Sequence, residues 1–560
     1  MGGPTDEKPP ILLSSDPKDQ ALNTKPSEIN LTFDEYVKLE NPNNQIIITP
    51  KIETDKVEFL AIKTRVNIKL NQELEDSTTY VFNFQKSVQD ITENNPVEKL
   101  KLVFSTGNSI DSLTLKGKIG YVFQQDNEEF EDILVGLYYD NDTLDLFSDA
   151  PYYISQADSS GKFEITNIKS GTFKVYAWHD VNNSLKAEFR SEAYGFLSEP
   201  LTIDKNIDNI QINLFRADLT DLKINRSAPS GSNFDIILSK PIIEYEVFHP
   251  NINNTMFHRI SDKTIRIYHK ELENDSTEIR LSLMDSVGFK VDTTLMARFE
   301  TSERAKEKLE ITVNSGEGFL SQINAELSFN KPIYNINFDS LYISYDSAGL
   351  ISINNENLEF EDSTKNVKLL ISINVPDSIK NNSFTLIAKD STFQDIEELW
   401  NESIVEANYT KFNPENLADG IIGTINTEER PLMIQLLDNN EKIIQQKYLE
   451  QTNQFEFTDI EASNYKIRVI VDRNQNKKWD PGNLYEKRQP EPIYYFYDTE
   501  TQSSEFILRG GWTLNDIILE PRQESGIQKT IYSSDQLIIE VLPKEIMDIT
   551  DEDLSTNVPG

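Results

Sequence analysis

The sequence FEITNI at residues 163–168 returns as FEFTDI at residues 455–460, and this pair decides how the chain is organised. The surrounding stretches, residues 163–188 and 455–480, align without a gap at a constant offset of 292 (455 − 163). In both, apolar and polar residues alternate and then run into a polar loop, which is typical of a strand and its turn. A repeated strand and loop indicates a modular array and not one large enzyme domain.

Length and composition limit the classes of function. The 560 residues suffice for about four domains, or for more if the domains are small β-modules. Cysteine is absent, which excludes disulfides, thiolate zinc sites and thiol nucleophiles. The 54 basic and 93 acidic residues give a net charge of −39, which repels nucleic acid phosphates and anionic membranes. We therefore expect proteins, sugars or cations as partners, and no nucleic acid.

The first hundred residues show short apolar runs of strand length, separated by turn residues. Several period-2 segments at this spacing, with almost no helical periodicity, predict an antiparallel sandwich. The runs are residues 29–33, 45–49, 66–70, 79–84 and 102–106.

Particular motifs in this region resemble the bacterial Ig-like domain of the S-layer type. They are Pro9-Pro10, a turn from Pro17 to Asn23, a strand from Phe33 to Val37, a strand from Leu74 to Tyr80, and the FSTG exit at residues 104–107. The resemblance implies an Ig-like sandwich at the start of the chain.

The repeated stretch is similar to the transthyretin-like or carboxypeptidase-regulatory-like fold. The motifs that carry this resemblance are GKF at residues 161–163 and GTFKV at residues 171–175. The second copy keeps the strand alternation but has Asn453 and Ser463 in place of the two glycines.

Together these patterns predict an all-β fold, a tandem array of Ig-like and transthyretin-like antiparallel β-sandwich modules. The predicted parts are an N-terminal tether (1–10), a bacterial Ig-like domain (11–108), a transthyretin-like domain (109–219), two Ig-like β-sandwiches (220–303 and 304–413), a second transthyretin-like domain (414–521) and an acidic docking tail (522–560).

The strongest candidate site is the loop that ends the second copy, with Asp472, Asn474, Asn476 and Asp480. Calcium binds six to eight oxygens, and this spacing offers three side-chain oxygens and a closing carboxylate. The sequence therefore predicts a calcium loop, with no other cofactor. The alternative is an Asx-rich turn whose side chains bond to their own backbone.

The calcium loop is not an EF-hand, and its first copy is less complete. Lys477 stands where an EF-hand needs glycine, and Asn483 stands where the bidentate glutamate would be. In the first copy, which has Asp180, Asn182, Ser184 and Glu188, a serine replaces one amide.

No catalytic constellation emerges from the sequence, so we predict that the protein is not an enzyme. His249, His258 and His269 are spaced by nine and eleven residues, which matches no compact zinc motif. A nucleophile elbow and a phosphate-binding loop are missing from the sequence. The four tryptophans could line a sugar platform or fill the core. They are Trp178, Trp400, Trp479 and Trp512.

The tail contains one apolar run, Leu537, Ile538, Ile539, Val541 and Leu542, interrupted only by Glu540. The run is too short for a domain of its own and too apolar for a solubilising tail. We expect it to dock on a partner or on this chain, as a strand added to a sheet edge or in a groove.

The start GGPTDEKPP at residues 2–10, with the Ig-like and transthyretin-like modules, resembles a group of Bacteroidota envelope lipoproteins. The resemblance implies a lipid anchor at an N-terminal cysteine that is missing from this chain, and an outer-membrane location, at the cell surface or else on the periplasmic face. It also implies a non-enzymatic interaction or scaffold subunit, whose partners are the outer-membrane proteins of an envelope complex such as the outer-membrane-protein assembly machinery. Two alternatives remain: an adhesin or glycan-binding surface protein, and an enzyme with an unrecognised catalytic domain.

Overall fold

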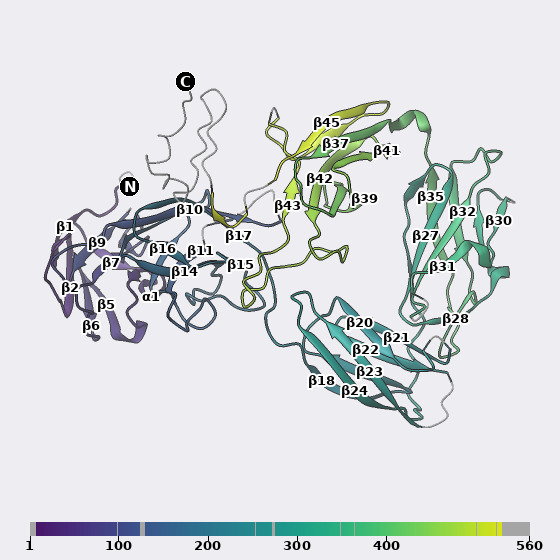
Figure 1. The fold of residues 1–560 in the computed structure, drawn as a ribbon, viewed down its shortest axis with the longest axis horizontal. Helices are drawn as coiled ribbons and strands as arrows, with labels where there is room; N and C mark the ends of the chain where they lie inside the picture. The colour runs from purple at the N-terminus through teal and green to yellow at the C-terminus, as the bar shows by residue number, and fades with distance from the viewer. Residues whose placement is uncertain are drawn as a thin grey trace, which may run out of the picture.

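The computed structural model describes residues 7–528 apart from 98, 124–128, 131, 253, 271–274, 348, 363–364, 500 and 522–523. Over this part of the chain β-strands dominate, and they form antiparallel-rich sandwiches that we call units 1 to 5 (Figure 1). Helix is confined to single turns. These are α1 (Pro42–Gln45), η1 (Thr54–Lys56), η2 (Phe338–Ser340), η3 (Asn355–Asn357) and η4 (Pro414–Asn416). The predicted all-β fold class is confirmed.

Unit 1 packs two sheets around a core of alternating apolar residues. One face of β2 buries Ile29, Leu31 and Phe33, as the period-2 pattern predicts. The first sheet is β1 (Leu12–Asp16), β2 (Glu28–Phe33), β6 (Arg65–Leu70) and β5 (Val57–Ile62); the second is β4 (Ile47–Thr49), β7 (Thr79–Asn83) and β9 (Lys101–Ser105); β3 (Val37–Leu39) pairs with β8 (Val88–Asp90).

Unit 2 contains the first copy of the repeat, on strands β13 and β14. Its first sheet is β13 (Lys162–Ile168), β10 (Leu113–Tyr121), β17 (Ile207–Leu214) and β46 (Gly526–Ile527). Its second sheet is β12 (Tyr153–Gln156), β11 (Ile133–Tyr139), β14 (Gly171–His179) and β15 (Tyr194–Phe196), with β16 (Leu201–Ile203) also paired to β14. The last strand of the first sheet, β46, comes from the far end of the described chain.

Units 3 and 4 are further two-sheet sandwiches with cores of their own. Unit 3 has β18 (Ile224–Ser230), β19 (Asn233–Leu238), β22 (Thr264–His269) and β21 (Met256–Ser261) facing β20 (Glu244–Phe248), β23 (Ser276–Met284) and β24 (Lys290–Arg298). Unit 4 has β25 (Ile311–Val313), β27 (Gln322–Phe329), β32 (Lys368–Asn374) and β31 (Leu358–Phe360) facing β26 (Glu317–Phe319), β35 (Val405–Lys411), β33 (Ser383–Ala388), β29 (Leu341–Ser344) and β30 (Leu350–Ser352), with the pair β28 (Ile333–Ile336) and β34 (Phe393–Asp395).

Unit 5 repeats the strand order of unit 2. Its sheets are β40 (Gln454–Phe457), β37 (Gly420–Ile425) and β45 (Thr513–Leu519), facing β39 (Ile443–Leu449), β38 (Leu432–Leu437), β42 (Ser463–Val471) and β43 (Ile493–Tyr495), with β44 (Phe506–Leu508) paired to β42 and the short pair β36 (Leu417–Ala418) and β41 (Ile460–Glu461). Strands β10 and β17 of unit 2 are parallel, and so are β37 and β45 of unit 5. The sequence repeat therefore corresponds to a duplicated sandwich.

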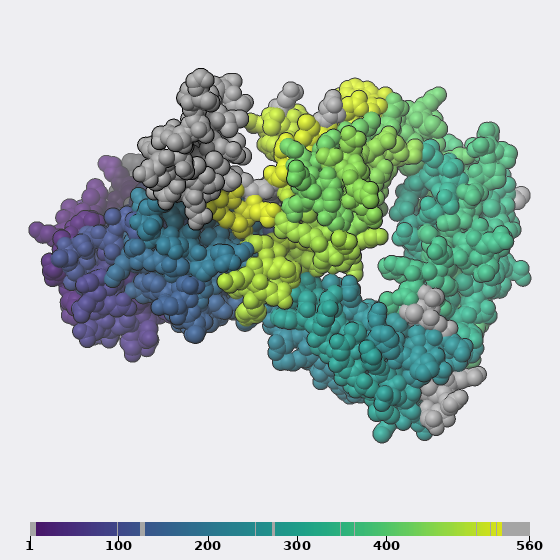
Figure 2. Space-filling model, viewed as in Figure 1, coloured from purple at the N-terminus to yellow at the C-terminus, as the bar shows by residue number. Residues whose placement is uncertain are grey.

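The five units do not form a straight rod. The chain closes on itself, because unit 5 packs against unit 2. Units 3 and 4 lie on the other side of unit 5, and units 3, 4 and 5 surround an opening that is visible in Figure 2. An apolar cluster joins unit 2 to units 3 and 5, and it includes Trp178, Val287, Met433 and Ile493. Apolar surface on the two duplicated units is therefore buried between them.

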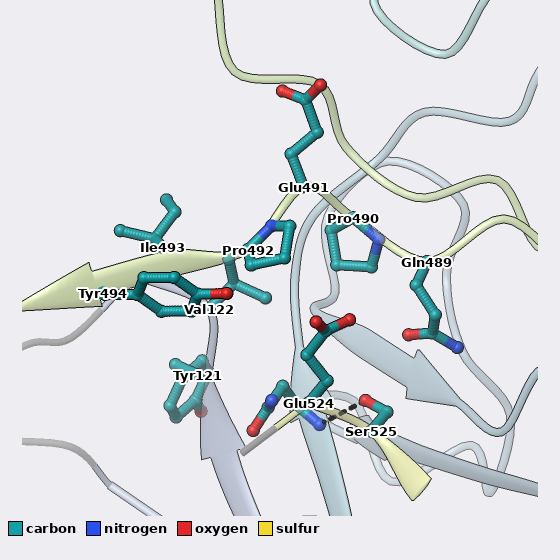
Figure 3. Close-up of a pocket in the computed structure, with 11 residues that line it drawn as sticks. Tyr121, Val122, Gln489, Pro490, Glu491, Pro492, Ile493, Tyr494, Glu524 and Ser525 are labelled. Atoms are coloured by element: carbon teal, nitrogen blue, oxygen red, sulfur yellow. Dashed lines mark hydrogen bonds between the residues drawn. The ribbon is translucent and has the colours of Figure 1, made fainter. Parts of the chain in front are cut away.

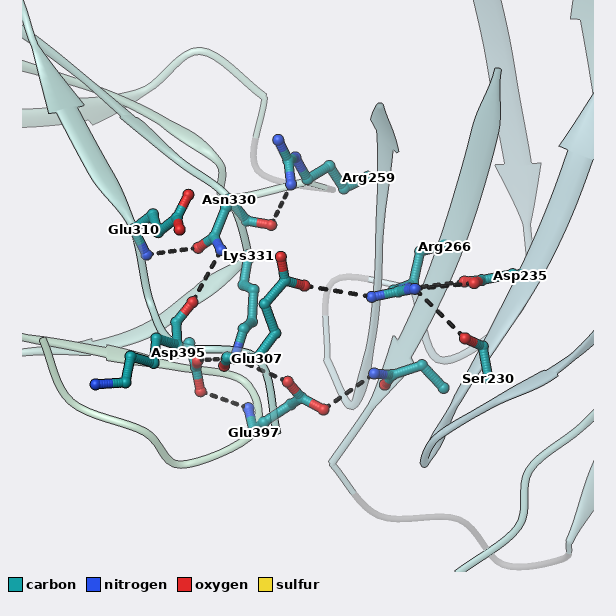
Figure 4. Close-up of polar contacts among 12 residues, drawn as sticks. Ser230, Asp235, Arg259, Arg266, Glu307, Glu310, Asn330, Lys331, Asp395 and Glu397 are labelled. Carbon is teal, nitrogen blue, oxygen red and sulfur yellow. Dashed lines mark hydrogen bonds and ion pairs between the residues drawn. The ribbon is translucent and has the colours of Figure 1, made fainter. Parts of the chain in front are cut away.

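Units 3 and 4 are joined by charged groups (Figure 4). Lys331 is buried in unit 4, and its ammonium group lies 2.8 Å from Asp395 and 2.9 Å from Glu397. Glu397 also accepts a hydrogen bond of 3.0 Å from the side chain of Asn233 in unit 3. Arg259 of unit 3 donates to the backbone carbonyl of Asn330 in unit 4. The shared carboxylate of Glu397 thus couples a buried ion pair to the junction.

Candidate functional site

The predicted calcium loop follows β42, and its first carboxylate is fully buried. Asp472 accepts backbone N–H bonds from Asn476 (3.1 Å) and Lys477 (2.8 Å), and a hydroxyl bond of 2.7 Å from Tyr448 on β39. Residues Gln475 and Lys477 have φ values of 64° and 61°, which fold the chain tightly around this carboxylate. Asp472 therefore stabilises the turn by accepting these three hydrogen bonds.

The two amides of the loop converge on its closing carboxylate. Asn474 and Asn476 donate to the same oxygen of Asp480, at 2.9 and 2.7 Å. The structure thus brings all four predicted residues together, through bonds of the kind expected for an Asx-rich turn. Among the described residues, three or more His, Cys, Asp or Glu side chains nowhere gather so as to hold a metal ion. Rotation of the two amides by half a turn would place their oxygens towards Asp480, where only a cation would stabilise them, so calcium stays a prediction.

A further carboxylate, Glu491, completes the loop and was missed from the sequence. Its oxygens accept the backbone N–H groups of Arg473 (2.7 Å) and Asp480 (3.0 Å), so it closes the loop from the other side. Burial, with the nearby charges of Asp480 and Asp472, raises the pKa of Glu491 to about 7.

The first copy of the loop has the same plan. Asp180 accepts the backbone N–H groups of Ser184 (2.9 Å) and Leu185 (3.0 Å), and Glu192 accepts those of Val181 (3.0 Å) and Glu188 (2.9 Å). Burial raises the pKa of both Asp180 and Glu192. Glu192 lies four residues after Glu188, whereas Glu491 lies eleven after Asp480, so seven extra residues hide the equivalence from a constant-offset alignment.

The longer segment between Asp480 and Glu491 forms hydrogen bonds from unit 5 to units 2 and 3. The side-chain amide of Gln489 donates to the carbonyl of Phe196 in unit 2 (2.8 Å), and Arg488 donates to the carbonyl of Val287 in unit 3 (3.0 Å). Trp479 packs edge-on against Phe123 of unit 2, with ring centroids 4.7 Å apart. The candidate calcium loop therefore also supports an interdomain joint.

The end of this joint encloses a small pocket of about 30 Å³ (Figure 3). Tyr121 and Val122 of unit 2 face Pro492 of unit 5 across it, and the C-terminal segment forms its floor. There Ser525 accepts the backbone N–H of Asn213 at 3.0 Å. The volume is close to that of a single water, so we assign the pocket to packing.

A larger cleft, of about 400 Å³, lies between units 1 and 2 and includes the first loop copy. Its lining is mainly polar: five amides (Asn44, Gln45, Gln85, Gln156 and Asn183), three carboxylates (Asp132, Asp158 and Asp180) and one cation (Lys86). Gln85 of unit 1 donates to Gln156 of unit 2 across the cleft at 2.6 Å. A neighbouring cleft of about 270 Å³ shares Asn44, Ile47 and Leu185 with it and so extends the groove.

The tryptophans do not make an aromatic platform in the described part of the chain. Trp178 is fully buried, and Trp479 is half-buried against Phe123. Trp512 is 52% exposed, and among the described residues its ring stacks only with the guanidinium of Arg509, which lies 4.9 Å from the ring centroid.

The three histidines that lie near one another in the sequence have different hydrogen-bond partners in the structure. His249 bonds to the hydroxyl of Thr277, His258 bonds to Tyr245, and His269 bonds to the carbonyl of Ser232. Burial lowers the pKa of His258 to about 4, so it stays neutral at physiological pH. These contacts are those of structural histidines.

Two family models match parts of the chain. Residues 6–106 match a bacterial Ig-like domain, and residues 127–182 match domain II of polysaccharide lyase family 4. The first match agrees with the Ig-like resemblance of unit 1. Each covers less than half of the chain, so they describe single units and not the whole protein. No curated protein sequence matches the chain.

Similar solved structures are distant. SGBP-B of the Bacteroides ovatus mixed-linkage glucan utilization locus, solved in complex with a mixed-linkage heptasaccharide, is 10% identical, with 71% of this chain and 93% of that chain covered and a TM-score of 0.16. The Bacillus anthracis TIE protein is 9% identical, with 93% and 76% covered and a TM-score of 0.13. Latent PorU of Porphyromonas gingivalis is 8% identical, with 72% and 47% covered and a TM-score of 0.22. At these scores the likenesses carry no conclusion about function.

Among the described residues, no helix is long and apolar enough to cross a membrane.

Proposed function

We propose that this protein is a non-catalytic surface-binding protein, an adhesin or glycan-binding protein, which holds a polyhydroxylated ligand in the cleft between units 1 and 2. The observation that carries the proposal is the lining of this cleft by five amides and three carboxylates. An amide both donates and accepts hydrogen bonds, and each oxygen of a carboxylate can accept two, so the set suits neighbouring sugar hydroxyls. Asp180 already accepts the backbone N–H groups of Ser184 and Leu185. The exposed Asp132 and Asp158 are therefore the carboxylates that a ligand can reach. The bacterial Ig-like match of unit 1 fits an extracellular module.

The charge of the cleft narrows the class of ligand. The lining of this cleft contains three carboxylates and one ammonium group, Lys86, which disfavours phosphorylated or sulfated ligands there. The adjoining cleft adds Lys51, Lys186 and Asp149. Since none of the four tryptophans lines the cleft, recognition would depend on hydrogen bonds more than on ring stacking. We therefore expect a neutral or amine-bearing glycan that binds weakly at one site and gains avidity from several copies at a surface.

The scaffold role, the lipid anchor and the outer-membrane location remain proposals that rest on the resemblance of the chain start. The comparisons above give no support to a part in outer-membrane-protein assembly. We place the adhesin or glycan-binding role first because it is the role for which the structure offers a lined cleft.

The test is to screen the full chain on a glycan array and to measure the best ligand by titration calorimetry. Asn44→Ala with Gln85→Ala removes one amide and one half of the amide pair that spans the cleft, and should weaken binding at least about tenfold. Gln446→Ala is the matched control, because it breaks the equivalent pair with Gln435 (2.6 Å) in unit 5, away from the cleft. Binding that resists the double variant, or an array with no ligand, would contradict the proposal.

A further inference from the structure

Strands β17 and β45 occupy the same place in the two duplicated units. In unit 2 the parallel partner of Gly117 is Ile210, and in unit 5 the parallel partner of Gly423 is Ile517, each directly after a register shift. A Cβ on Gly117 would lie 2.2 Å from the carbonyl oxygen of Ile210, and a Cβ on Gly423 would lie 2.5 Å from that of Ile517. The same close approach fixes the same register in both units.

Only one of these two strands has its outer edge covered in the described structure. In unit 2, β46 pairs with Ile210 and Gln211 of β17, and Gln528 donates to the carbonyl of Asn209 at 2.9 Å. In the part of the chain that the structure describes, β45 pairs with β37 alone. It lies at the upper rim of unit 5 in Figure 1.

The outer edge of β45 presents apolar surface. Ile518 on β45 is equivalent to Gln211 on β17, because each comes one residue after the partner of the glycine. The exposed fraction of the side chain is 54% for Ile518 but 9% for Gln211. Ile422 on the neighbouring strand β37 is 42% exposed. An edge strand with unpaired backbone groups and exposed aliphatic side chains is a template for a further strand.

We propose that residues 537–542 of this chain pair with the outer edge of β45 as an antiparallel strand. These residues, LIIEVL, lie outside the described structure. In a strand, Leu537, Ile539 and Val541 would share one face, and Glu540 would lie on the other. The wholly apolar face would lie beside Ile518 and Ile422 on the outer face of the sheet, and Glu540 would lie on the opposite face of the added strand, at the rim of the sandwich.

Chain length and direction favour this chain's own tail as the occupant. Nine residues lead from the end of β45 to the end of the described chain (Leu519 to Gln528, 528 − 519), and nine more lead from there to Leu537 (537 − 528). The distance from Leu519 to Gln528 is at most the reach of nine extended residues, so the nine residues from Gln528 to Leu537 are long enough to return to Leu519. A chain that returns to the C-terminal end of β45 runs antiparallel to it, as β46 runs along β17.

Disulfide trapping tests the pairing, because the chain has no cysteine of its own. Ile518→Cys is combined with one tail substitution per variant. These are Leu537→Cys, Ile538→Cys, Ile539→Cys, Glu540→Cys, Val541→Cys and Leu542→Cys. Gln211→Cys with Gly526→Cys, which are paired residues of β17 and β46, is the positive control. Ile507→Cys, on β44 and 62% exposed, replaces Ile518→Cys in the negative control.

We expect disulfides within one chain at alternate tail positions, at least about tenfold more than with the Ile507→Cys control, because a strand places every second side chain on one face. Equal cross-linking at all six positions, or no more than in the control, would overturn the pairing. Disulfides that link two chains would also overturn it, since the edge would then receive the tail of a second copy.

Discussion

At the scale of single residues, the buried carboxylate of Glu491 makes a pH-dependent contribution to stability. Its pKa is about 7 in the folded protein and 4.5 ordinarily, so the folded state binds more protons between these values. The free energy of unfolding should therefore fall as pH rises from 4.5 to 7, by at most about 3 kcal/mol from this group.

Melting temperatures between pH 4 and 8 check this expectation. Glu491→Gln should flatten the pH dependence in that window, because glutamine does not titrate. Glu486→Gln, an exposed carboxylate of the same joint, is the control and should leave the profile as in the parent protein. A parent-like profile in Glu491→Gln would mean that another group titrates there.

The calcium prediction belongs to the same loop. If a cation binds Asp472, Asn474, Asn476 and Asp480, calcium should raise the melting temperature, by a linkage term of about 2.7 kcal/mol at a hundredfold excess over the dissociation constant. Asp472→Ala with Asp480→Ala should abolish the response.

The matched control removes two carboxylates from other Asx turns. Asp145 accepts the N–H of Phe147 (3.0 Å), and Asp438 accepts that of Asn440 (2.8 Å), as Asp472 does in its own loop. Asp145→Ala with Asp438→Ala should keep the calcium response. The calcium site would be contradicted if calcium did not change the melting temperature of the parent protein, or if the change persisted in the loop variant. The loop would then be an Asx-rich turn.

At the scale of elements, the structure changes the expectation for a truncated tail. From the sequence, cutting after Pro521 removes no strand, but β46 lies beyond this point and pairs with β17. The cut also removes Glu524, which lies 3.1 Å from Arg473 of the candidate loop. Truncation after Pro521 should therefore destabilise the protein by about 1–3 kcal/mol, through lost backbone bonds and an uncovered edge.

Truncation after Gln528 is the control, because it keeps β46 and removes only residues outside the described structure. Chemical denaturation of the two proteins measures the difference. Equal midpoints would show that β46 contributes no stability.

The sequence predicts an element well when the residues that define it are close together in the chain. The alternation in β2 or β27 is local, and its buried positions follow directly from the sequence. The four loop residues were also found, because their spacing is local. Glu491 was missed because seven extra residues displace it, and β46 was missed because two residues show no periodicity. The docking run at 537–542 lies outside the described residues and stays a prediction.

At the scale of the whole molecule, the sequence predicts modules but says little about their arrangement. Closure of unit 5 onto unit 2 depends on contacts between residues hundreds of positions apart, such as Phe123 with Trp479 and Phe196 with Gln489. Apolar residues at these places look like ordinary core residues in the sequence. Their partners become visible only once both units are folded.

The joint can be opened by substitution, and this is the sharpest test of the closed arrangement. Trp479→Ala with Gln489→Ala removes the aromatic contact with Phe123 and the bond to the carbonyl of Phe196, and should weaken the docking of unit 5 by about 2–4 kcal/mol. Because Trp479 also donates to the carbonyl of Glu491 (2.9 Å), the substitution loosens the loop that carries the joint.

Small-angle X-ray scattering should then report a larger radius of gyration and maximum dimension, while far-ultraviolet circular dichroism stays β-rich because each sandwich keeps its own core. Trp512→Ala is the matched control, since this tryptophan is 52% exposed and lies outside the joint. The closure would be refuted if the parent protein already scattered as an extended rod. If the double variant and Trp512→Ala kept the same compact dimensions, the closed form would be held by the rest of the apolar cluster, around Trp178 and Met433, without a need for Trp479 and Gln489.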